Sequence, residues 1–167
     1  MLDVIESLEN SKEFKEFKKE NPESYLCSAF FVVGRTPEEA KKQVNYAMSK
    51  SSYEVMSFDI STSGKIVAQK LDSIKNETLH QIEKKDVSVT IDQLVANIEA
   101  ETKRKFDKII AVLQDLNGVL IWNVTCMDGF VLHRYHIDAK SGKVEKMKDI
   151  KLQDMMRVEK KTPDYIQ

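Results

Sequence analysis

The sequence predicts an α+β protein in which an amphipathic helix precedes a group of antiparallel strands, and in which this order occurs twice. Residues 12–20 and 90–106 place apolar side chains at helical spacing. Aromatic and β-branched runs alternate with short turns that contain glycine, serine or asparagine, as antiparallel strands do. Two segments, Phe58–Ile66 and Tyr135–Val144, also resemble each other around a Ser-Gly-Lys turn.

The first predicted helix covers residues 12–20. Asn10 or Ser11 can accept the free backbone N–H groups of its first turn. Phe14 and Phe17 are three residues apart and therefore share one face, which we expect to point to the core. The following Asn-Pro pair ends the helix, because proline lacks the backbone donor.

The first group of strands is predicted at Tyr25–Val33, Tyr53–Ile60 and Lys65–Leu71. The segment between the first two is ambiguous. Thr36–Glu39 is typical of a helix start, with proline in the first helical position. Gln43–Met48 instead alternates between apolar and polar residues, so we favour a strand from Gln43 and a loop at the following serines.

The second half begins after Asp72–Lys85, a polar segment predicted as irregular or weakly helical. Thr90 and Gln93 have the spacing of a capping box, which predicts a helix start at this point. The helix has an apolar face made of Ile91, Leu94, Val95, Ile98 and Phe106.

The remaining chain predicts four strands joined by turns. The strands are Ile109–Gln114, Val119–Met127, Phe130–Asp138 and Val144–Ile150. The turns are Asn117-Gly118, Asp128-Gly129 and Lys140–Gly142, of which Asn-Gly is the strongest hairpin signal. Apolar residues from Lys151 onward again have helical spacing.

Two segments of the second half, Ile121–Thr125 and His133–Val144, resemble the PepSY domain. The family pattern is a helix, several strands, and an aliphatic-Asp-x-x-Thr/Ser-Gly-x-aliphatic turn. Phe17–Leu26 is similar to a segment of uncharacterised small archaeal proteins that carry such a domain in tandem. The resemblance implies two cystatin-like units, each a helix packed on a curved antiparallel sheet. The units cover residues 1–85 and 86–150, and residues 151–167 form a tail.

Composition excludes several classes of protein. The chain has 26 Lys and Arg against 27 Asp and Glu residues, and this balance argues against a nucleic-acid partner. The N-terminus lacks the pattern of a secretory signal, and no apolar run reaches the ~20 residues that span a bilayer. We therefore expect no membrane association and a cytoplasmic location. Cys27 and Cys126 are then interpreted as buried thiols, with a disulfide or a reactive nucleophile as alternatives.

No catalytic set, metal site or cofactor motif is evident. His133 and His136 point to opposite faces of a strand and cannot share a metal ion. Arg134, His136 and Asp138 share the other face, where the alternatives are a solvated polar surface and a ligand site. Trp122 is interpreted as a core residue, with a ligand groove or interface anchor as the alternative.

These four residues, Trp122, Arg134, His136 and Asp138, are the candidate ligand or partner contacts. The lysines from Lys143 to Lys161 are a candidate surface for an acidic partner.

Three functions follow from these observations. The first is a non-catalytic module that binds an unidentified protein or peptide, or a second copy of the chain, through its open sheets. The second is a small-molecule carrier or small enzyme with a site between helix and sheet. The third is an intracellular peptidase inhibitor, which the resemblance implies because PepSY domains are known as propeptide inhibitors of thermolysin-type peptidases. PepSY domains carry no catalytic residues of their own.

Overall fold

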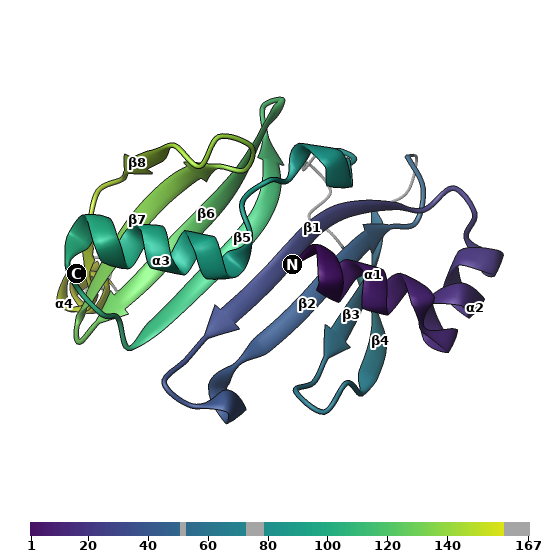
Figure 1. Cartoon of the computed structure of the whole chain (residues 1–167), viewed down its shortest axis with the longest axis horizontal. Coiled ribbons are helices and arrows are strands. Elements are labelled where there is room, and N and C mark those ends of the chain that lie inside the picture. The colour runs from purple at the N-terminus through teal and green to yellow at the C-terminus, as the bar shows by residue number, and fades with distance from the viewer. Residues whose placement is uncertain (51–52, 73–78, 159–167) are drawn as a thin grey trace, which may run out of the picture.

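A computed structural model describes residues 1–50, 53–72 and 79–158. It is an α+β fold in which antiparallel strands form one continuous sheet, with three helices on one face (Figure 1). The strand order is β4-β3-β2-β1-β5-β6-β7-β8, and β9 pairs with β7. The first four strands are β1 (Tyr25–Val33), β2 (Lys41–Ala47), β3 (Glu54–Ile60) and β4 (Ile66–Asp72). The others are β5 (Lys108–Leu116), β6 (Val119–Asp128), β7 (Val131–Asp138), β8 (Val144–Lys146) and β9 (Ile150–Lys151).

Two short helices, α1 (Leu2–Asn10) and α2 (Lys12–Glu20), begin the chain. Ser11 separates them, because its extended backbone breaks the helix and its hydroxyl accepts the Phe14 N–H at 3.2 Å. The capping residue is therefore Ser11 and not Asn10, which is the last residue of α1. Only the second of these helices is predicted from the sequence.

The core of the first half is aromatic. Phe14 and Phe17 from α2 pack on Tyr46 of β2 and Phe58 of β3, with ring centroids 4.8 Å apart for Phe14–Tyr46 and 5.3 Å for Phe17–Phe58. The Tyr46 hydroxyl donates to the Glu9 carboxylate at 3.0 Å. This bond gives the buried hydroxyl of Tyr46 a hydrogen-bond partner, and it links α1 to the sheet.

The ambiguous segment before β2 is mostly strand. Pro37–Glu39 forms a single 3₁₀ turn, and β2 begins at Lys41, two residues before the expected start. The Glu39 carboxylate accepts the Arg35 N–H at 2.9 Å, so the acidic residue closes a loop instead of starting a helix. Gly34 is required here because a Cβ at this position would collide with the Glu39 side chain.

The connection to the second half is irregular where it is described, apart from a 3₁₀ turn at Lys84–Asp86, and residues 73–78 lie outside the described residues. Ile82 is buried, and its N–H donates to the Leu26 carbonyl at 2.8 Å. The helix α3 (Ile91–Thr102) starts with the expected capping box between Thr90 and Gln93. It ends at Lys103 in the left-handed conformation, so Phe106 lies beyond the helix and not on its face.

The hairpin at Asn117-Gly118 is as predicted, with both residues at positive φ (55° and 84°). Two other expectations are wrong. Asp128 still pairs with Val131, so the second tight turn is Gly129-Phe130 and not Asp128-Gly129. The strand expected at 144–150 is broken after Lys146, and its last residue belongs to β9. The helix α4 (Leu152–Val158) then follows, as the apolar spacing predicts.

The two halves join through β1 and β5, which pair antiparallel from Ala29–Leu113 to Val33–Ile109. Each half thus contributes helix and then strands in chain order, β1 to β4 in the first half and β5 to β9 in the second. The similar segments Phe58–Ile66 and Tyr135–Val144 both form the turn between the third and fourth strand of their half. The largest apolar cluster of the described residues extends through both halves, between the sheet and the helices.

Candidate functional site

The sheet has two faces, and the predicted contact residues do not share one. We call the face that packs on α1, α2 and α3 the inner face, and the opposite one the outer face. Trp122 lies on the inner face with Val124 and Cys126 in the main core. Arg134 and His136 lie on the outer face of β7, as the alternation of burial along this strand shows.

Trp122 is a core residue. Its side chain is fully buried, its ring centroid lies 5.9 Å from that of Phe31, and its Nε1–H donates to the Val89 carbonyl at 3.2 Å. The hydrogen bond attaches the segment before α3 to the sheet. The same segment donates two N–H groups, of Ser88 and Val89, to the Ala139 carbonyl.

Asp138 closes the turn after β7. Its carboxylate accepts the backbone N–H of Lys140 at 3.0 Å and of Ser141 at 2.6 Å. Hydrogen bonds from Ser141, backbone first and then side chain, lower the pKa of this carboxyl below its usual range, and Lys140 adds to the effect. The carboxylate therefore has a local structural role.

His136 lies in a row of residues that crosses the outer face from strand to strand. Along this row, residues pair directly in the order Gln43, Phe30, Val112, Asn123, His136 and Glu145. The row changes from apolar at β1 and β5 to polar at β6 and β7. Arg134 lies in the neighbouring row, opposite Thr125.

The centre of the outer face carries an apolar stripe, which we define as Phe30, Val32, Ile110, Val112 and Ile121. Phe30 pairs with Val112 and Val32 with Ile110 across the junction of the two halves. Val32 and Ile121 are 9% and 7% exposed, yet neither belongs to the main core cluster. A water-facing sheet is ordinarily polar, so this stripe is unusual.

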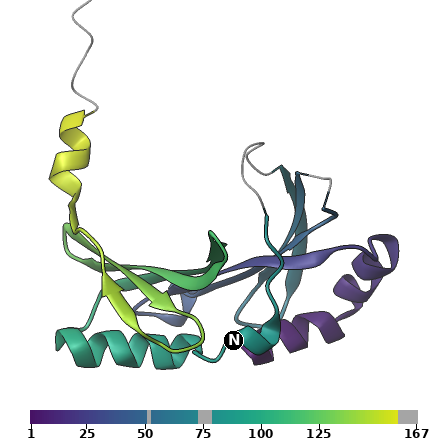
Figure 2. The same ribbon diagram turned by 90° about the horizontal axis from the view of Figure 1, so that it is seen from above.

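Figure 2 shows the outer face from the side. Among the described elements, the helices α1, α2 and α3 lie below the sheet, and α4 and the β3–β4 end rise at its two sides. No described helix or strand covers the outer face between them. The apolar stripe therefore lies on a side of the sheet that no described helix or strand covers. Val32 and Ile121 are nevertheless buried, and Phe30, Ile110 and Val112 are half-buried.

A second feature, which was not predicted from the sequence, is the buried His133 on the inner face. The residue is 8% exposed and shares its face with Tyr135 and Ile137. Its ring lies 5.8 Å from that of Phe106. The period-two pattern of β7, which separates His133 from His136, is also the signal that could have placed His133 among the buried residues.

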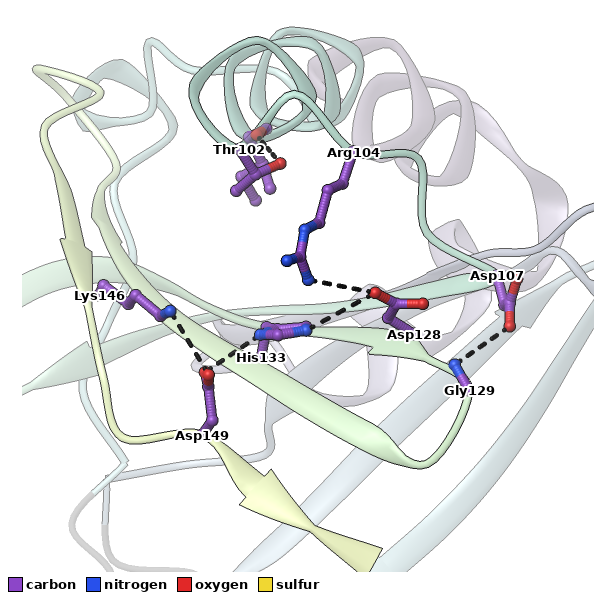
Figure 3. Close-up of polar contacts among 9 residues, drawn as sticks. Thr102, Arg104, Asp107, Asp128, Gly129, His133, Lys146 and Asp149 are labelled. Carbon is purple, nitrogen blue, oxygen red and sulfur yellow. Dashed lines mark hydrogen bonds and ion pairs between the residues drawn. The ribbon is translucent and has the colours of Figure 1, made fainter.

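His133 lies between two acidic side chains, each of which also contacts a basic side chain (Figure 3). Its Nε2 is 3.9 Å from an Asp128 carboxylate oxygen, and its Nδ1 is 3.2 Å from Asp149 Oδ1. Beyond these acids, Arg104 lies 3.3 Å from Asp128 and Lys146 lies 3.4 Å from Asp149. A protonated imidazole would face a carboxylate on each side.

The polar atoms at the centre of this group are buried and incompletely satisfied. His133 Nε2 and Asp149 Oδ1 have no hydrogen-bond partner in the described structure. Both residues line a pocket of about 350 Å³ between the end of α3, β7 and β8, together with Glu101, Phe106 and Lys146. A buried polar atom without a partner is costly, so a ligand that forms hydrogen bonds with these atoms would lower the free energy of the site.

Cys27 and Cys126 are free and buried, as interpreted from the sequence. Burial raises the pKa of the Cys27 thiol to about 11 and that of Cys126 to about 12. Both groups are therefore neutral thiols at physiological pH, which is unsuited to a nucleophile. In the described part of the chain, no three His, Cys, Asp or Glu side chains are grouped to bind a metal ion.

The predicted basic surface near the C-terminus is described only in part. Lys146 is engaged with Asp149, and Lys160 and Lys161 lie outside the described residues. Within the residues that the structure describes, no helix is both long and apolar enough to cross a bilayer.

No protein-family model matches this chain, and no curated protein matches it. Its fold is similar to the crystal structure of a "putative lipoprotein" from Clostridium difficile 630, with a TM-score of 0.57 and 14% sequence identity. The match covers 83% of this chain and 90% of the other. At this identity the similarity concerns the fold alone, and it extends over most of both chains.

Proposed function

We propose that this chain is a non-catalytic binding module made of two PepSY-like, cystatin-like units, and that it binds an apolar segment of another protein on its outer face. The order of helix followed by antiparallel strands, which occurs in both halves, supports the two units. The similar sequences at the two third-to-fourth strand turns support this interpretation. The cytoplasmic location remains a prediction, which cell fractionation would test.

The apolar stripe carries the proposal. Its residues come from both halves, since Phe30 and Val32 belong to β1 and the others to β5 and β6. Phe30, Ile110 and Val112 are half-buried, and a partner that covers them would remove their remaining apolar surface from water, as at other interaction sites. Asn123, Arg134 and His136 lie beside the stripe and supply a polar rim.

The test compares two glutamate substitutions on the same strand. Val112→Glu places a charge in the middle of the stripe, whereas Leu116→Glu replaces an exposed apolar residue at the hairpin end. Partners captured from cell extract are identified by mass spectrometry, and the affinity of the purified partner is then measured. We expect Val112→Glu to weaken binding at least about tenfold and Leu116→Glu to leave it unchanged. Equal effects of both variants, with far-UV circular dichroism intact, would contradict the proposal.

A second candidate function, a small-molecule carrier, is favoured by the His133 pocket. This pocket lies between helix and sheet, and its buried nitrogen has no partner in the described structure. We would titrate a panel of small carboxylic acids, amines and amino acids while following the histidine ring resonances by NMR. A carrier predicts a compound that shifts the His133 signals, leaves the exposed His80 unshifted, and fails to stabilise the His133→Ala variant. A panel without such a compound would count against this function.

A further inference from the structure

The β4 strand forms one end of the sheet and offers an unpaired edge. It pairs with β3 over its whole length, from Glu54–Asp72 to Ile60–Ile66, and with no other described strand. The backbone groups on its far side can therefore accept another strand, since every second residue of an edge strand directs its N–H and C=O outward.

This edge lacks the devices that usually block strand addition. The seven residues of β4 contain no proline, and the pairing with β3 runs without a bulge. The lysine within the strand, Lys70, lies 2.6 Å from Glu54 of the neighbouring strand, so its charge is balanced inside the protein. Val67 and Leu71 are 50% and 38% exposed on the outer face.

The opposite end of the sheet is different. There β8 has three residues and β9 has two, and both pair with β7. A second chain could form only a short ladder at this end. The long regular edge at β4 is thus the end suited to pairing between molecules.

The sequence of β4 is complementary to a second, antiparallel copy of the same strand. When two copies pair antiparallel over the full strand, Gln69 lies opposite Gln69 of the second copy. The same register places Val67 opposite Leu71 twice, so two exposed apolar pairs form on one face. Lys70 then lies opposite Ala68, and no two like charges face each other directly.

We infer that β4 pairs with β4 of a second copy to form an antiparallel homodimer with one continuous sheet. The ladder contains about six to eight backbone hydrogen bonds, depending on which residues point outward. The chain already uses this kind of contact internally, where β1 and β5 join its two halves. The inference does not depend on the outer-face proposal, because the edge and the stripe are different surfaces.

Disulfide trapping tests the register. Directly opposed residues of an antiparallel pair have Cα atoms about 4.5–5.5 Å apart, within the range for a disulfide. Gln69→Cys should therefore cross-link to itself under mild oxidation, while the native cysteines are buried. Val67→Cys alone should not, because its copies lie about 14 Å apart, but mixing it with Leu71→Cys should give a heterodimer.

Light scattering with size-exclusion chromatography measures the dimer itself. Leu71→Lys should weaken dimerisation at least about tenfold, because it removes an apolar pair and adds two charges. Val112→Glu should leave the dimer unchanged. A monomeric wild-type protein, or a dimer lost in Val112→Glu and kept in Leu71→Lys, overturns the inference. Efficient self-cross-linking of Val67→Cys overturns the register.

Discussion

Replacing Trp122 by phenylalanine separates a core role from a contact role for this residue. The indole is fully buried on the inner face, and its N–H donates to the Val89 carbonyl at 3.2 Å. Phenylalanine keeps an aromatic ring but removes the donor and part of the buried surface. The expected result is a large loss of stability with no direct effect on a partner bound at the outer face.

The magnitude follows from two contributions. Leaving the buried Val89 carbonyl without its partner costs about 1–3 kcal/mol. Two fewer buried ring carbons cost about 1.5 kcal/mol, at roughly 0.8 kcal/mol for each. The free energy of unfolding should therefore fall by roughly 2.5–4.5 kcal/mol. Domains of this kind have about 5–15 kcal/mol in total, so the variant should still fold.

Urea unfolding measures this loss. Trp122 is the only tryptophan of the chain, so the transition is followed by far-UV circular dichroism and not by fluorescence. Ile98→Val is the matched control, because it removes one buried methyl group without a hydrogen bond and should cost about 0.5–1.5 kcal/mol. A loss for Trp122→Phe no larger than that of the control would refute the role of the hydrogen bond. Weaker partner binding at unchanged stability would make Trp122 a contact residue.

Three further outcomes are expected. Because hydrogen bonds in the native turn lower the pKa of Asp138, its contribution is present above the unfolded carboxyl pKa and lost as pH falls through the folded one. Asp138→Asn should therefore cost about 0.5–1 kcal/mol at pH 7, after allowance for solvent screening, and nothing measurable in urea unfolding at pH 2. The thiols of Cys27 and Cys126, with pKa values raised by burial to about 11 and about 12, should react with a thiol reagent at pH 8 only after unfolding. Gly118→Ala, at φ 84° in open space, should cost about 1–2 kcal/mol through backbone strain alone and lower Tm by about 2–8 °C in a calorimetric scan.

Local features were predictable from the sequence because their physics is local. The capping box of Thr90 and Gln93 spans four residues, and the Asn117-Gly118 turn needs only two positive φ angles. Alternation along β6 and β7 placed Trp122 inward and Arg134 and His136 outward in the same way. Near Pro37 the sequence contains signals for both a helix start and a strand. The structure has only a 3₁₀ turn at Pro37–Glu39, and the strand β2 follows it.

The candidate sites depended on distant parts of the chain. The apolar stripe exists because β1 pairs with β5, which lie far apart in the sequence, and no periodicity specifies which edges of two sheets will meet. The contact between His133 and Asp149 depends on the break in the chain after β8, because this break brings Asp149 to the imidazole ring. An unbroken strand at 144–150, as expected from the sequence, does not predict this contact.

The sequence by itself thus determined the α+β class, most of the helices and strands, and the buried faces of β3, β6 and β7, because helix and strand periods are properties of neighbouring residues. Only the tertiary structure decided that the two halves share one sheet, that one face of it stays open, and that His133 is buried between two aspartates. Those outcomes come from strand pairing and packing between residues far apart in the chain. The free energy of this pairing and packing depends on the shape and burial of side chains from distant segments, which a local sequence pattern does not specify.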